Sequence, residues 1–352
     1  MVTSKTLIFA HVPQGIPVAG KDVTVEARPV DTDATPPTGG FVARVLYASF
    51  DPYLRHRLVD AAGARDFPPF ELGASIVNGV VVEVLRSGED SGLSKDDVLV
   101  GMGPIAHYAI IGPQDAVTFQ KVQNPFNLDL KLFLGPLGMP GLTAYSAFYE
   151  IARPKKGEKI FISAASGAVG QIVGQLAKRE GLTAIGSVGS DAKLTILKEK
   201  LGFDEGFNYK KVDVLKELKR LAPNGIDIYY DNVGGKQLEA AITALKDFGR
   251  IVACGYASQY SVPHDKQYGV RNTGLVVGKR ITWRGFTVFD DGFGNKYAAE
   301  HQQNVQKWIH DGSIRPLMSV TRGMDRAPEG LVGLFRGENI GKAVLDVWAK
   351  DA

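Results

Sequence analysis

The sequence predicts an α/β protein of two domains, a small all-β domain and a larger domain built on a doubly wound parallel sheet. Two observations lead to this fold class. A chain of 352 residues is longer than one compact core usually accommodates, so two domains are the default expectation. Short strand-like stretches fill the first 130 residues, whereas strands and helices alternate after about residue 134.

The N-terminal part of the chain consists of strand-like stretches separated by loops. Each stretch is rich in Val, Ile and aromatic residues and is bounded by Gly; the stretches are 39–50, 74–88 and 96–112. Clusters of Pro and Gly at 36–40 and 67–73 mark loops. Because no sustained helical period interrupts this pattern, we expect a small all-β domain over residues 1–130.

The central part opens with a strand and a helix. Residues 158–165 form a continuous apolar run, as expected for a strand that is buried on both faces. The helix that follows carries Val169, Ile172, Val173 and Leu176, which form one apolar stripe at helical spacing. A second strand-like run and a second helix, ended by a glycine, repeat this pattern over 182–202.

The alternation continues along the chain. The further expected elements are helices at 211–222, 236–247 and 296–312, and strands at 226–235, 249–255 and 279–289. Strands joined through single helices form βαβ units, which predicts a parallel, doubly wound sheet over 131–312. Irregular sequence then leads to a final strand-like run at 341–349, and we expect residues 313–352 to complete the first domain.

Composition argues against several classes of protein. The net charge of +3 gives no basic stripe of the kind that binds nucleic acid. No apolar run approaches the roughly 18 residues that a membrane span needs, and the first residues lack the apolar core of a signal peptide. The single cysteine, Cys254, is compatible with a reducing compartment. These features predict a cytoplasmic protein without nucleic-acid or membrane partners.

A small-residue turn, SAASGAVGQIVGQLAK at 163–178, joins the strand at 158–165 to its helix. Gly167 permits a tight turn, and Gly170 and Gly174 permit close packing of the helix against the strand. The helix N-terminus offers backbone N–H groups to a pyrophosphate. Ala164 stands where the strictest dinucleotide fingerprint has glycine. The pattern predicts dinucleotide binding, with a plain structural turn as the alternative.

The end of the second strand indicates which dinucleotide binds. NAD sites usually place Asp or Glu there, whereas this chain has Gly189 and Ser190, with the acid displaced to Asp191 and a cation at Lys193. Without a carboxylate at the strand end, a 2′-phosphate is not repelled, and a nearby ammonium group attracts it. NADPH is therefore preferred over NADH. The alternative is that Lys193 simply lies on a solvated helix face.

A catalytic metal is not expected. One cysteine excludes a four-cysteine zinc lobe, and the six histidines show no ligand spacing. Cys254 follows an apolar strand and reads as a small buried hydrophobic residue.

Seven short motifs occur together in this chain. They are DPYLR (51–55), LGMPGLTAY (137–145), AASGAVG (164–170), GFDEGFNYK (202–210), DNVGG (231–235), FGRIVACG (248–255) and GENIGK (337–342). In this order they resemble the zinc-independent medium-chain dehydrogenase/reductase superfamily, and within it the leukotriene B4 12-hydroxydehydrogenase/prostaglandin reductase group, which includes plant 2-alkenal reductases. The resemblance extends from about residue 40 to residue 349.

The resemblance implies a fold and an assembly. A GroES-like β domain made from both chain ends would accompany a central Rossmann domain, with the nicotinamide meeting substrate in a cleft between them. Homodimers in this superfamily often pair the last Rossmann strand across a two-fold axis, which corresponds to residues 281–288 here.

The resemblance also implies cofactor contacts. Gly167, Ala168, Val169 and Gly170 correspond to the pyrophosphate site, and Ser190, Lys193 and Tyr209 to the site of the adenosine 2′-phosphate. The positions that match contacts to the nicotinamide half are Asn232, Cys254, Gly255, Tyr256, Ser258, Tyr260, Phe286, Val288 and Asn339.

Two tyrosines are the candidate catalytic residues. The reductases of this group carry a tyrosine just after the CG strand end, and Tyr260 stands there. Its phenol would donate a hydrogen bond to a substrate carbonyl and stabilise the enolate that develops. Tyr53 in DPYLR is the second candidate, and it is better suited to line the cleft. The chain departs from the group at Tyr256 and Gln259, and at 102–111 and 261–278, so substrate identity does not transfer.

These inferences predict an NADPH-dependent ene-reductase that acts on small apolar α,β-unsaturated ketones or aldehydes. Quinone reduction and alcohol oxidation are alternatives within the family, because all three reactions need the same cofactor domain. A non-catalytic NADPH-binding protein, as found among lens crystallins of this superfamily, is the alternative of another class. A homodimer is expected.

Overall fold

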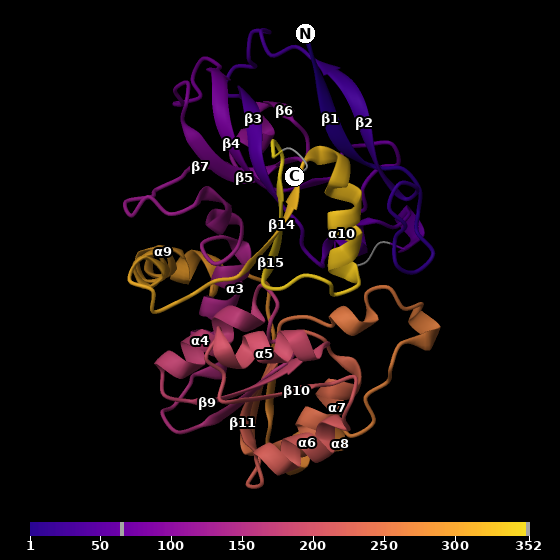
Figure 1. Cartoon of the computed structure of the whole chain (residues 1–352), viewed down its shortest axis with the longest axis vertical. Helices are drawn as coiled ribbons and strands as arrows, with labels where there is room; N and C mark the ends of the chain where they lie inside the picture. Colours follow the sequence, from indigo (N-terminus) through magenta and orange to yellow (C-terminus); the bar gives the residue numbers. More distant parts are fainter. Residues whose placement is uncertain (64–66, 350–352) are drawn as a thin grey trace. The chain divides into compact units, whose positions relative to one another are not determined.

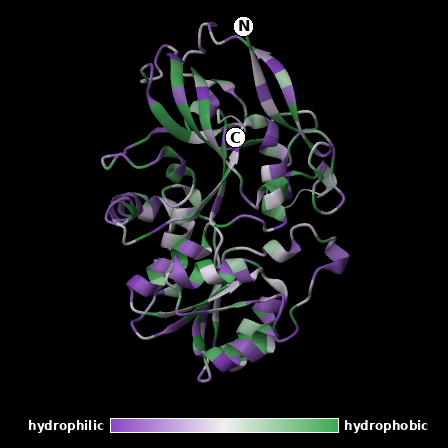
Figure 2. Cartoon of the chain, viewed as in Figure 1, coloured by the Kyte–Doolittle hydropathy of each residue, from purple (hydrophilic) through white to green (hydrophobic). Residues whose placement is uncertain are grey.

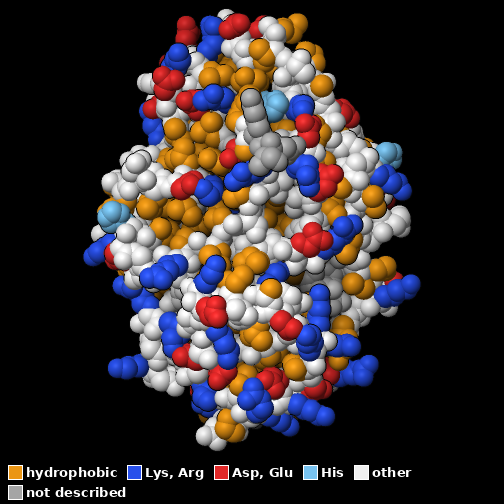
Figure 3. Space-filling view, in the orientation of Figure 1, with side chains coloured by type: hydrophobic (Ala, Val, Ile, Leu, Met, Phe, Trp, Pro, Cys, Tyr) orange, Lys and Arg blue, Asp and Glu red, His pale blue; other side chains and the backbone are white. Residues whose placement is uncertain are grey.

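The chain divides into two compact units in a computed structural model that describes residues 1–63 and 67–349 (Figure 1). The β unit comprises Met1–Gly135 and Met318–Ala352, and the parallel-sheet unit comprises Pro136–Leu317. On the face shown in Figure 3, Lys and Arg side chains lie among Asp and Glu side chains in both units. Within the described ranges, every helix is too short or too polar to cross a membrane.

The β unit holds a mixed sheet in which both ends of the chain take part. Its strands run in the order β14-β15-β3-β4-β5-β7, and β6 pairs with β3. Their bounds are β3 Phe41–Ser49, β4 Val77–Ser87, β5 Val98–Pro104, β6 Tyr108–Ile111, β7 Gln120–Lys121, β14 Met318–Arg322 and β15 Lys342–Asp346. β15 lies antiparallel to β3, with Val344 opposite Ser49 (Figure 1). The start of β15 is therefore brought to the residues that follow β3.

Two parts of this unit differ from the prediction. A separate pair of antiparallel strands, β1 (Val2–Phe9) and β2 (Val23–Val30), precedes the main sheet. The region expected to be irregular contains β14 and the helix α10 (Ala327–Phe335). Proline and two glycines mask the helical signal of α10, whereas Leu331 is fully buried in the core of this unit. Tertiary packing thus outweighs weak local propensity.

The parallel-sheet unit has six parallel strands in the order β10-β9-β8-β11-β12-β13. Their bounds are β8 Lys159–Ile162, β9 Thr183–Val188, β10 Glu205–Asn208, β11 Ile226–Asp231, β12 Leu245–Ala253 and β13 Thr282–Gly285. The order reverses between β8 and β11, which makes this the switch point of a doubly wound sheet. The predicted α/β class, with a Rossmann-type parallel sheet and a β unit, is confirmed.

Helices α3 to α9 belong to the parallel-sheet unit. Their bounds are α3 Met139–Ala147, α4 Gly170–Arg179, α5 Asp191–Glu199, α6 Val214–Leu221, α7 Gly235–Ala244, α8 Gly274–Gly278 and α9 Gly294–His310. The predicted apolar stripe of α4 is correct, since Ile172, Val173 and Leu176 are fully buried. Figure 2 shows hydrophobic residues recurring along the strands that these helices cover.

Several predicted bounds were wrong by three or more residues. The strands expected over 158–165 and 226–235 end at Ile162 and Asp231. Two further errors have a clear cause. The helix expected over 236–247 ends at Ala244, because Leu245 pairs with Ile226 as the first residue of β12. The strand expected over 279–289 stops at Gly285, because the Thr287 N–H and hydroxyl both donate to Asp290 in a turn. Both errors arise where a long-range pairing or a local side-chain bond overrides the apolar pattern.

Candidate functional site

The turn after β8 has the close backbone packing expected of a dinucleotide site. The Gly167 N–H donates to the Ala164 carbonyl at 2.9 Å, and Ala164 itself adopts a left-handed backbone conformation with φ +46°. A Cβ on Gly170 would lie 2.4 Å from that same carbonyl oxygen, so only glycine fits at the first residue of α4. The left-handed conformation that favours glycine thus falls on Ala164, the position where the strictest fingerprint has glycine.

Gly174 permits a close contact, but its partner is a side chain. A Cβ at this position would lie 2.0 Å from Cζ of Phe203. Phe203 is buried and belongs to the segment of the chain that joins α5 to β10. The glycine therefore lets α4 approach Phe203, where the sequence suggested approach to a strand. Together with Gly170, it sets α4 with its N-terminus at the switch point, and this arrangement fits a pyrophosphate group.

The residues after β9 fit a 2′-phosphate. Ser190 caps α5, because its Oγ accepts a hydrogen bond from the Lys193 N–H at 3.3 Å. The Tyr209 N–H donates to the Val188 carbonyl at 3.1 Å, and a Cβ on Gly189 would lie 3.4 Å from the Tyr209 hydroxyl. Ser190, the Lys193 backbone N–H and Tyr209 therefore lie at the carboxyl end of β9, and their contact with a 2′-phosphate stays a prediction.

Asp191, the displaced acid, is held by groups of the protein. Its carboxylate accepts from Asn208 Nδ2 at 2.9 Å and pairs with the Lys211 ammonium group. The Asn208 hydrogen bond and the Lys211 contact lower the pKa of this carboxyl below its usual range. Its negative charge is thus partly compensated, which reduces its repulsion of a phosphate.

Asn232 connects the two strands at the switch point. Its backbone N–H donates to Ser163 Oγ at 2.9 Å, and its Nδ2 donates to the Ser163 carbonyl at 2.8 Å. The preceding Asp231 is buried and accepts bonds from the Tyr229 hydroxyl and the N–H groups of Val233 and Gly234. Burial raises the pKa of Asp231 despite these bonds. Asn232 is therefore fixed beside the turn after β8.

The chain after β12 packs onto this site. The N–H groups of Cys254 and Gly255 both donate to the Asp231 carbonyl at 2.9 Å, and Ser258 Oγ donates to the Val233 carbonyl at 2.6 Å. Burial raises the pKa of the Cys254 thiol to about 12, so the group is neutral at pH 7. Asn232, Cys254, Gly255 and Ser258, which are predicted to contact the nicotinamide half, therefore lie together at the carboxyl ends of β11 and β12.

Tyr260 folds back over the end of β12. Its ring meets that of Tyr256 edge to face at 4.8 Å, and its hydroxyl accepts a 3.4 Å hydrogen bond from the Tyr256 N–H. A Cβ on Gly255 would lie 3.1 Å from this hydroxyl, so glycine makes room for the phenol. The candidate catalytic hydroxyl is thus held at the same edge of the sheet as Asn232.

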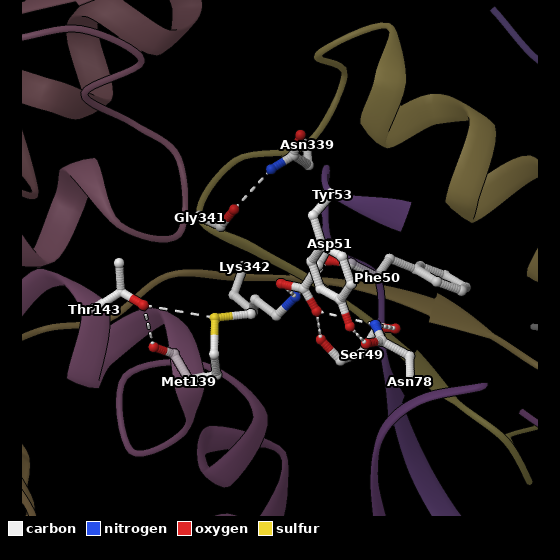
Figure 4. A network of polar contacts seen from close by, with 10 residues as sticks. All are labelled: Ser49, Phe50, Asp51, Tyr53, Asn78, Met139, Thr143, Asn339, Gly341 and Lys342. Carbon is white, nitrogen blue, oxygen red and sulfur yellow. Dashed lines mark hydrogen bonds and ion pairs between the residues drawn. The ribbon is translucent and has the colours of Figure 1, made fainter. Parts of the chain in front are cut away.

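Phe286 and Val288 follow β13. Phe286 stacks on Phe293 with ring centroids 4.8 Å apart, and Val288 is buried and accepts a backbone hydrogen bond from Gly294. Val288 therefore has a structural role whether or not it contacts a cofactor. Asn339 belongs to the β unit, where its Nδ2 donates to the Gly341 carbonyl at 2.7 Å (Figure 4).

Tyr53 lies in a polar network of the β unit that sequence reasoning did not reveal (Figure 4). Its hydroxyl donates to Asn78 Oδ1 at 2.5 Å, and burial raises the pKa of this phenol well above its usual range. Asn78 in turn contacts Asp51, which pairs with Lys342 at 2.8 Å. Asp51 belongs to the motif DPYLR and Lys342 to the motif GENIGK. Because the two residues are 291 positions apart, the local sequence does not indicate that they are in contact.

Two family models match the chain. One, described as a zinc-binding dehydrogenase, matches residues 168–303, and one described as an N-terminal domain of oxidoreductase matches residues 5–119. Similar curated proteins include the NADP-dependent oxidoreductase RED1 of Cochliobolus heterostrophus, which is 49% identical over 99% of this chain and 98% of that protein. The chain belongs to the zinc-independent medium-chain dehydrogenase/reductase superfamily.

Other members of this superfamily are similar over most of their length. The 2-alkenal reductase (NADP(+)-dependent) of Nicotiana tabacum is 41% identical over 98% of both chains, and the (+)-pulegone reductase of Mentha piperita is 39% identical over 88% of both. The crystal structure of CurA from Vibrio vulnificus in complex with NADPH superimposes with a TM-score of 0.88 at 30% identity, covering 98% of this chain and 100% of that one. Escherichia coli quinone oxidoreductase, at 20% identity and a TM-score of 0.73 over 97% and 99% of the chains, shows the fold alone.

The chain is therefore an oxidoreductase, and the geometry after β8 and β9 fits NADPH as its cofactor. Although one family model is described by zinc, no three His, Cys, Asp or Glu side chains in the described part of the chain are grouped to hold a metal ion.

Proposed function

We propose that this protein is an NADPH-dependent ene-reductase that reduces the C=C bond of α,β-unsaturated ketones or aldehydes. The observation that carries the proposal is the Tyr260 hydroxyl, held against Gly255 at the sheet edge where Asn232 and the turn after β8 meet. The similarity to proteins named 2-alkenal reductase and (+)-pulegone reductase supports the same reaction class.

In this proposal the parallel-sheet unit binds NADPH and the β unit contributes to substrate binding. The turn from Gly167 to Gly170 would hold the pyrophosphate, and Ser190, Lys193 and Tyr209 the 2′-phosphate. The nicotinamide half would contact Asn232, the residues from Cys254 to Ser258, Tyr260, Phe286, Val288 and Asn339. When bound, NADPH supplies a hydride for the β-carbon of the substrate.

Tyr260 has the role of hydrogen-bond donor to the substrate carbonyl. The bond from the Tyr256 N–H uses a lone pair of the Tyr260 oxygen, and a phenol that accepts a hydrogen bond can also donate one. Donation to the carbonyl oxygen stabilises the negative charge that develops there as the β-carbon is reduced. The α-carbon then takes a proton from solvent or from the tyrosine, and a saturated ketone or aldehyde results.

The first test is turnover with product identification. Purified protein, NADPH and 3-nonen-2-one are mixed, absorbance is followed at about 340 nm, and the product is identified by mass spectrometry. We expect saturated ketone, slower turnover with NADH, and a kcat about 100-fold lower for Tyr260→Phe, since a positioned acid contributes about 10²- to 10⁴-fold. Tyr268→Phe is the matched control, because Tyr268 donates to Glu239 in the same unit and has no assigned role.

The same assay distinguishes the alternatives by product. Hydroquinone from a quinone, with no saturated ketone from the enone, would make the protein a quinone reductase. Dehydrogenation of an allylic alcohol with NADP⁺ alone would make it an alcohol dehydrogenase. NADPH binding without turnover of any of these substrates would make it a non-catalytic binding protein.

We extend the proposal to a cytoplasmic homodimer. The strand β13 supports a dimer, because it lies at the edge of the sheet and all four of its residues are exposed. An exposed edge strand offers unpaired backbone groups to the same strand of a second copy. Light scattering coupled to size-exclusion chromatography tests this, and a mass near 38 kDa would contradict it, since the monomer is 37.9 kDa.

A further inference from the structure

The first position after β9 is lined by a lysine that has no role in the site described above. This position is Gly189, and NAD-binding proteins usually carry an acidic side chain here that bonds to the ribose 2′-hydroxyl. A Cβ on Gly189 would lie 3.4 Å from the Tyr209 hydroxyl and 3.6 Å from Lys210 Cε. A side chain at position 189 would therefore contact both a phenol hydroxyl and the end of a lysine side chain.

The backbone does not require glycine at position 189. Gly189 has no positive φ, so other residues can adopt its conformation. The distances of 3.4 Å and 3.6 Å are ordinary van der Waals contacts, so an alanine would also fit. Glycine instead leaves room for a ligand group beside Tyr209 and Lys210, and it brings no negative charge to this place.

Lys210 differs from its neighbour Lys211 in what its ammonium group contacts. Lys211 Nζ pairs with the Asp191 carboxylate, which also accepts from Asn208 Nδ2 at 2.9 Å. Among the residues that the structure describes, none forms an ion pair or hydrogen bond with Lys210 Nζ. The base of this side chain is fixed, since the Lys210 N–H donates to Asn208 Oδ1 at 3.1 Å. Lys210 therefore places an exposed, uncompensated positive charge next to Gly189.

A 2′-phosphate suits this place for a geometric reason. The acid of an NAD site bonds to the ribose 2′-hydroxyl, and the phosphate of NADPH is attached to that same oxygen. The groups that would line an acidic side chain at position 189 are therefore the groups that line the phosphate. The Tyr209 hydroxyl can donate to a phosphate oxygen, and the Lys210 ammonium group can donate to it and balance its charge.

We infer that Lys210 is a further 2′-phosphate-binding residue and helps to determine the preference for NADPH over NADH. This inference rests on the NADPH-binding part of the proposed function, and the motifs that the family shares assign no role to Lys210. Lys211 has a different effect: it acts through Asp191, whose negative charge it compensates.

Cofactor titrations followed by NADPH and NADH fluorescence test the assignment without any turnover. Lys210→Met keeps most of the side-chain length and removes the charge. We expect it to weaken NADPH binding about 10-fold, the size of one charge-assisted hydrogen bond, and to change NADH binding less than about twofold. Lys210→Arg should keep NADPH affinity within about threefold of the wild-type value, because the positive charge is retained.

Lys198→Met is the matched control. Lys198 is an exposed lysine of α5, and its Nζ pairs at 3.0 Å with Glu205, at the opposite end of β10 from Asn208. This variant should leave both dissociation constants unchanged. The melting temperature of Lys210→Met should stay within about 1 °C of the wild-type value, because exposed side chains without protein partners contribute little to stability.

Two fragments of the cofactor show which group Lys210 contacts. 2′,5′-ADP carries the 2′-phosphate and lacks the nicotinamide, whereas 5′-AMP lacks both. In competition titrations, Lys210→Met should weaken 2′,5′-ADP binding about as much as it weakens NADPH binding, about 10-fold, and should leave 5′-AMP binding unchanged. An equal loss for both fragments would overturn the inference.

The Asp191→Asn background separates a direct contact from an effect of local charge. Here Lys211→Met should change the Kd for NADPH less than about twofold, because the charge that it compensates is gone. Lys210→Met should keep its full effect in the same background. If that effect disappears, Lys210 acts through Asp191, and the inference is wrong.

Failure of the proposed reaction gives a different pattern. If the wild-type protein yields no saturated ketone but binds NADPH more tightly than NADH, the ene-reductase proposal fails, and the titrations still decide the role of Lys210. If the wild-type protein does not distinguish the two cofactors, or if Lys210→Met weakens both equally or neither, the inference is overturned whatever the reaction.

Discussion

Replacing Lys342 with methionine should destabilise the β unit far more than replacing Lys342 and Asp51 together. The Lys342 ammonium group and the Asp51 carboxylate are both almost completely buried, and Lys342 Nζ lies 2.8 Å from Asp51 Oδ1. In Lys342→Met the Asp51 carboxylate stays buried, with only the donors of Ser49 and Asn78 to solvate it. In the double variant Asp51→Asn/Lys342→Met, neither position carries a buried charge and the side-chain volumes are nearly unchanged.

The magnitude follows from the burial of the pair. Removing one partner of a buried ion pair costs about 3–5 kcal/mol, because an uncompensated charge remains. Removing both partners leaves the Phe50 carbonyl without its donor, which costs about 1–3 kcal/mol, and apolar packing offsets part of this. We therefore expect the single variant to lose about 2 kcal/mol more than the double variant.

Urea unfolding followed by tryptophan fluorescence measures this difference. Trp348 reports on the β unit, because its indole N–H donates to the Val45 carbonyl at 2.7 Å. With an m-value of about 2 kcal/mol/M, the single variant should unfold at about 1 M less urea than the double variant. Lys5→Met is the control, since the exposed Lys5–Asp325 pair should contribute less than about 1 kcal/mol. Equal midpoints for the single and double variants would refute the reasoning.

Three further predictions concern the parallel-sheet unit. Burial lowers the pKa of His301 from 6.5 to about 4, so between these two pH values the unfolded chain binds this proton and the folded chain does not. The free energy of unfolding should therefore fall by about 3 kcal/mol from pH 6.5 to pH 4. In urea titrations, His301→Gln should flatten this pH dependence. Gly174→Ala should lower the melting temperature by several degrees, because its Cβ would overlap Phe203, whereas Gly278→Ala, with open space around it, should not; equal effects would contradict the packing argument. Lys193→Ala should weaken NADPH binding about 10-fold in fluorescence titrations and leave NADH binding unchanged. Lys198→Ala, on the same helix, is the control. An equal loss of affinity for both cofactors would assign Lys193 another role.

The glycine turn after β8 was predictable because its determinants are local. Gly167, Gly170 and the stripe of α4 lie within one strand–turn–helix unit, so spacing alone indicates how they fold. The displacement of the acid to Asp191 was likewise visible from the strand end. The structure adds that this acid contacts Asn208, at the end of β10, and Lys211, which follows that strand.

The tail of the chain was less predictable for a physical reason. α10 contains Pro and Gly, so its propensity is low, and it forms because Leu331 and its neighbours complete the core of the β unit. β14 has no strong alternation of its own and is stabilised by pairing with β15. Such elements depend on partners from distant segments, which a local pattern does not report.

The sequence by itself determined the α/β class, the family and the glycine turn after β8, because each depends on short-range spacing and residue type. The tertiary structure alone decided that Lys342 contacts Asp51, that Asn78 donates to Asp51, and that the Tyr53 hydroxyl donates to Asn78. The physical reason is that hydrogen-bond polarity depends on the whole chain of partners. Those partners come from β4, from the end of β3 and from the start of β15, which only the folded sheet brings together.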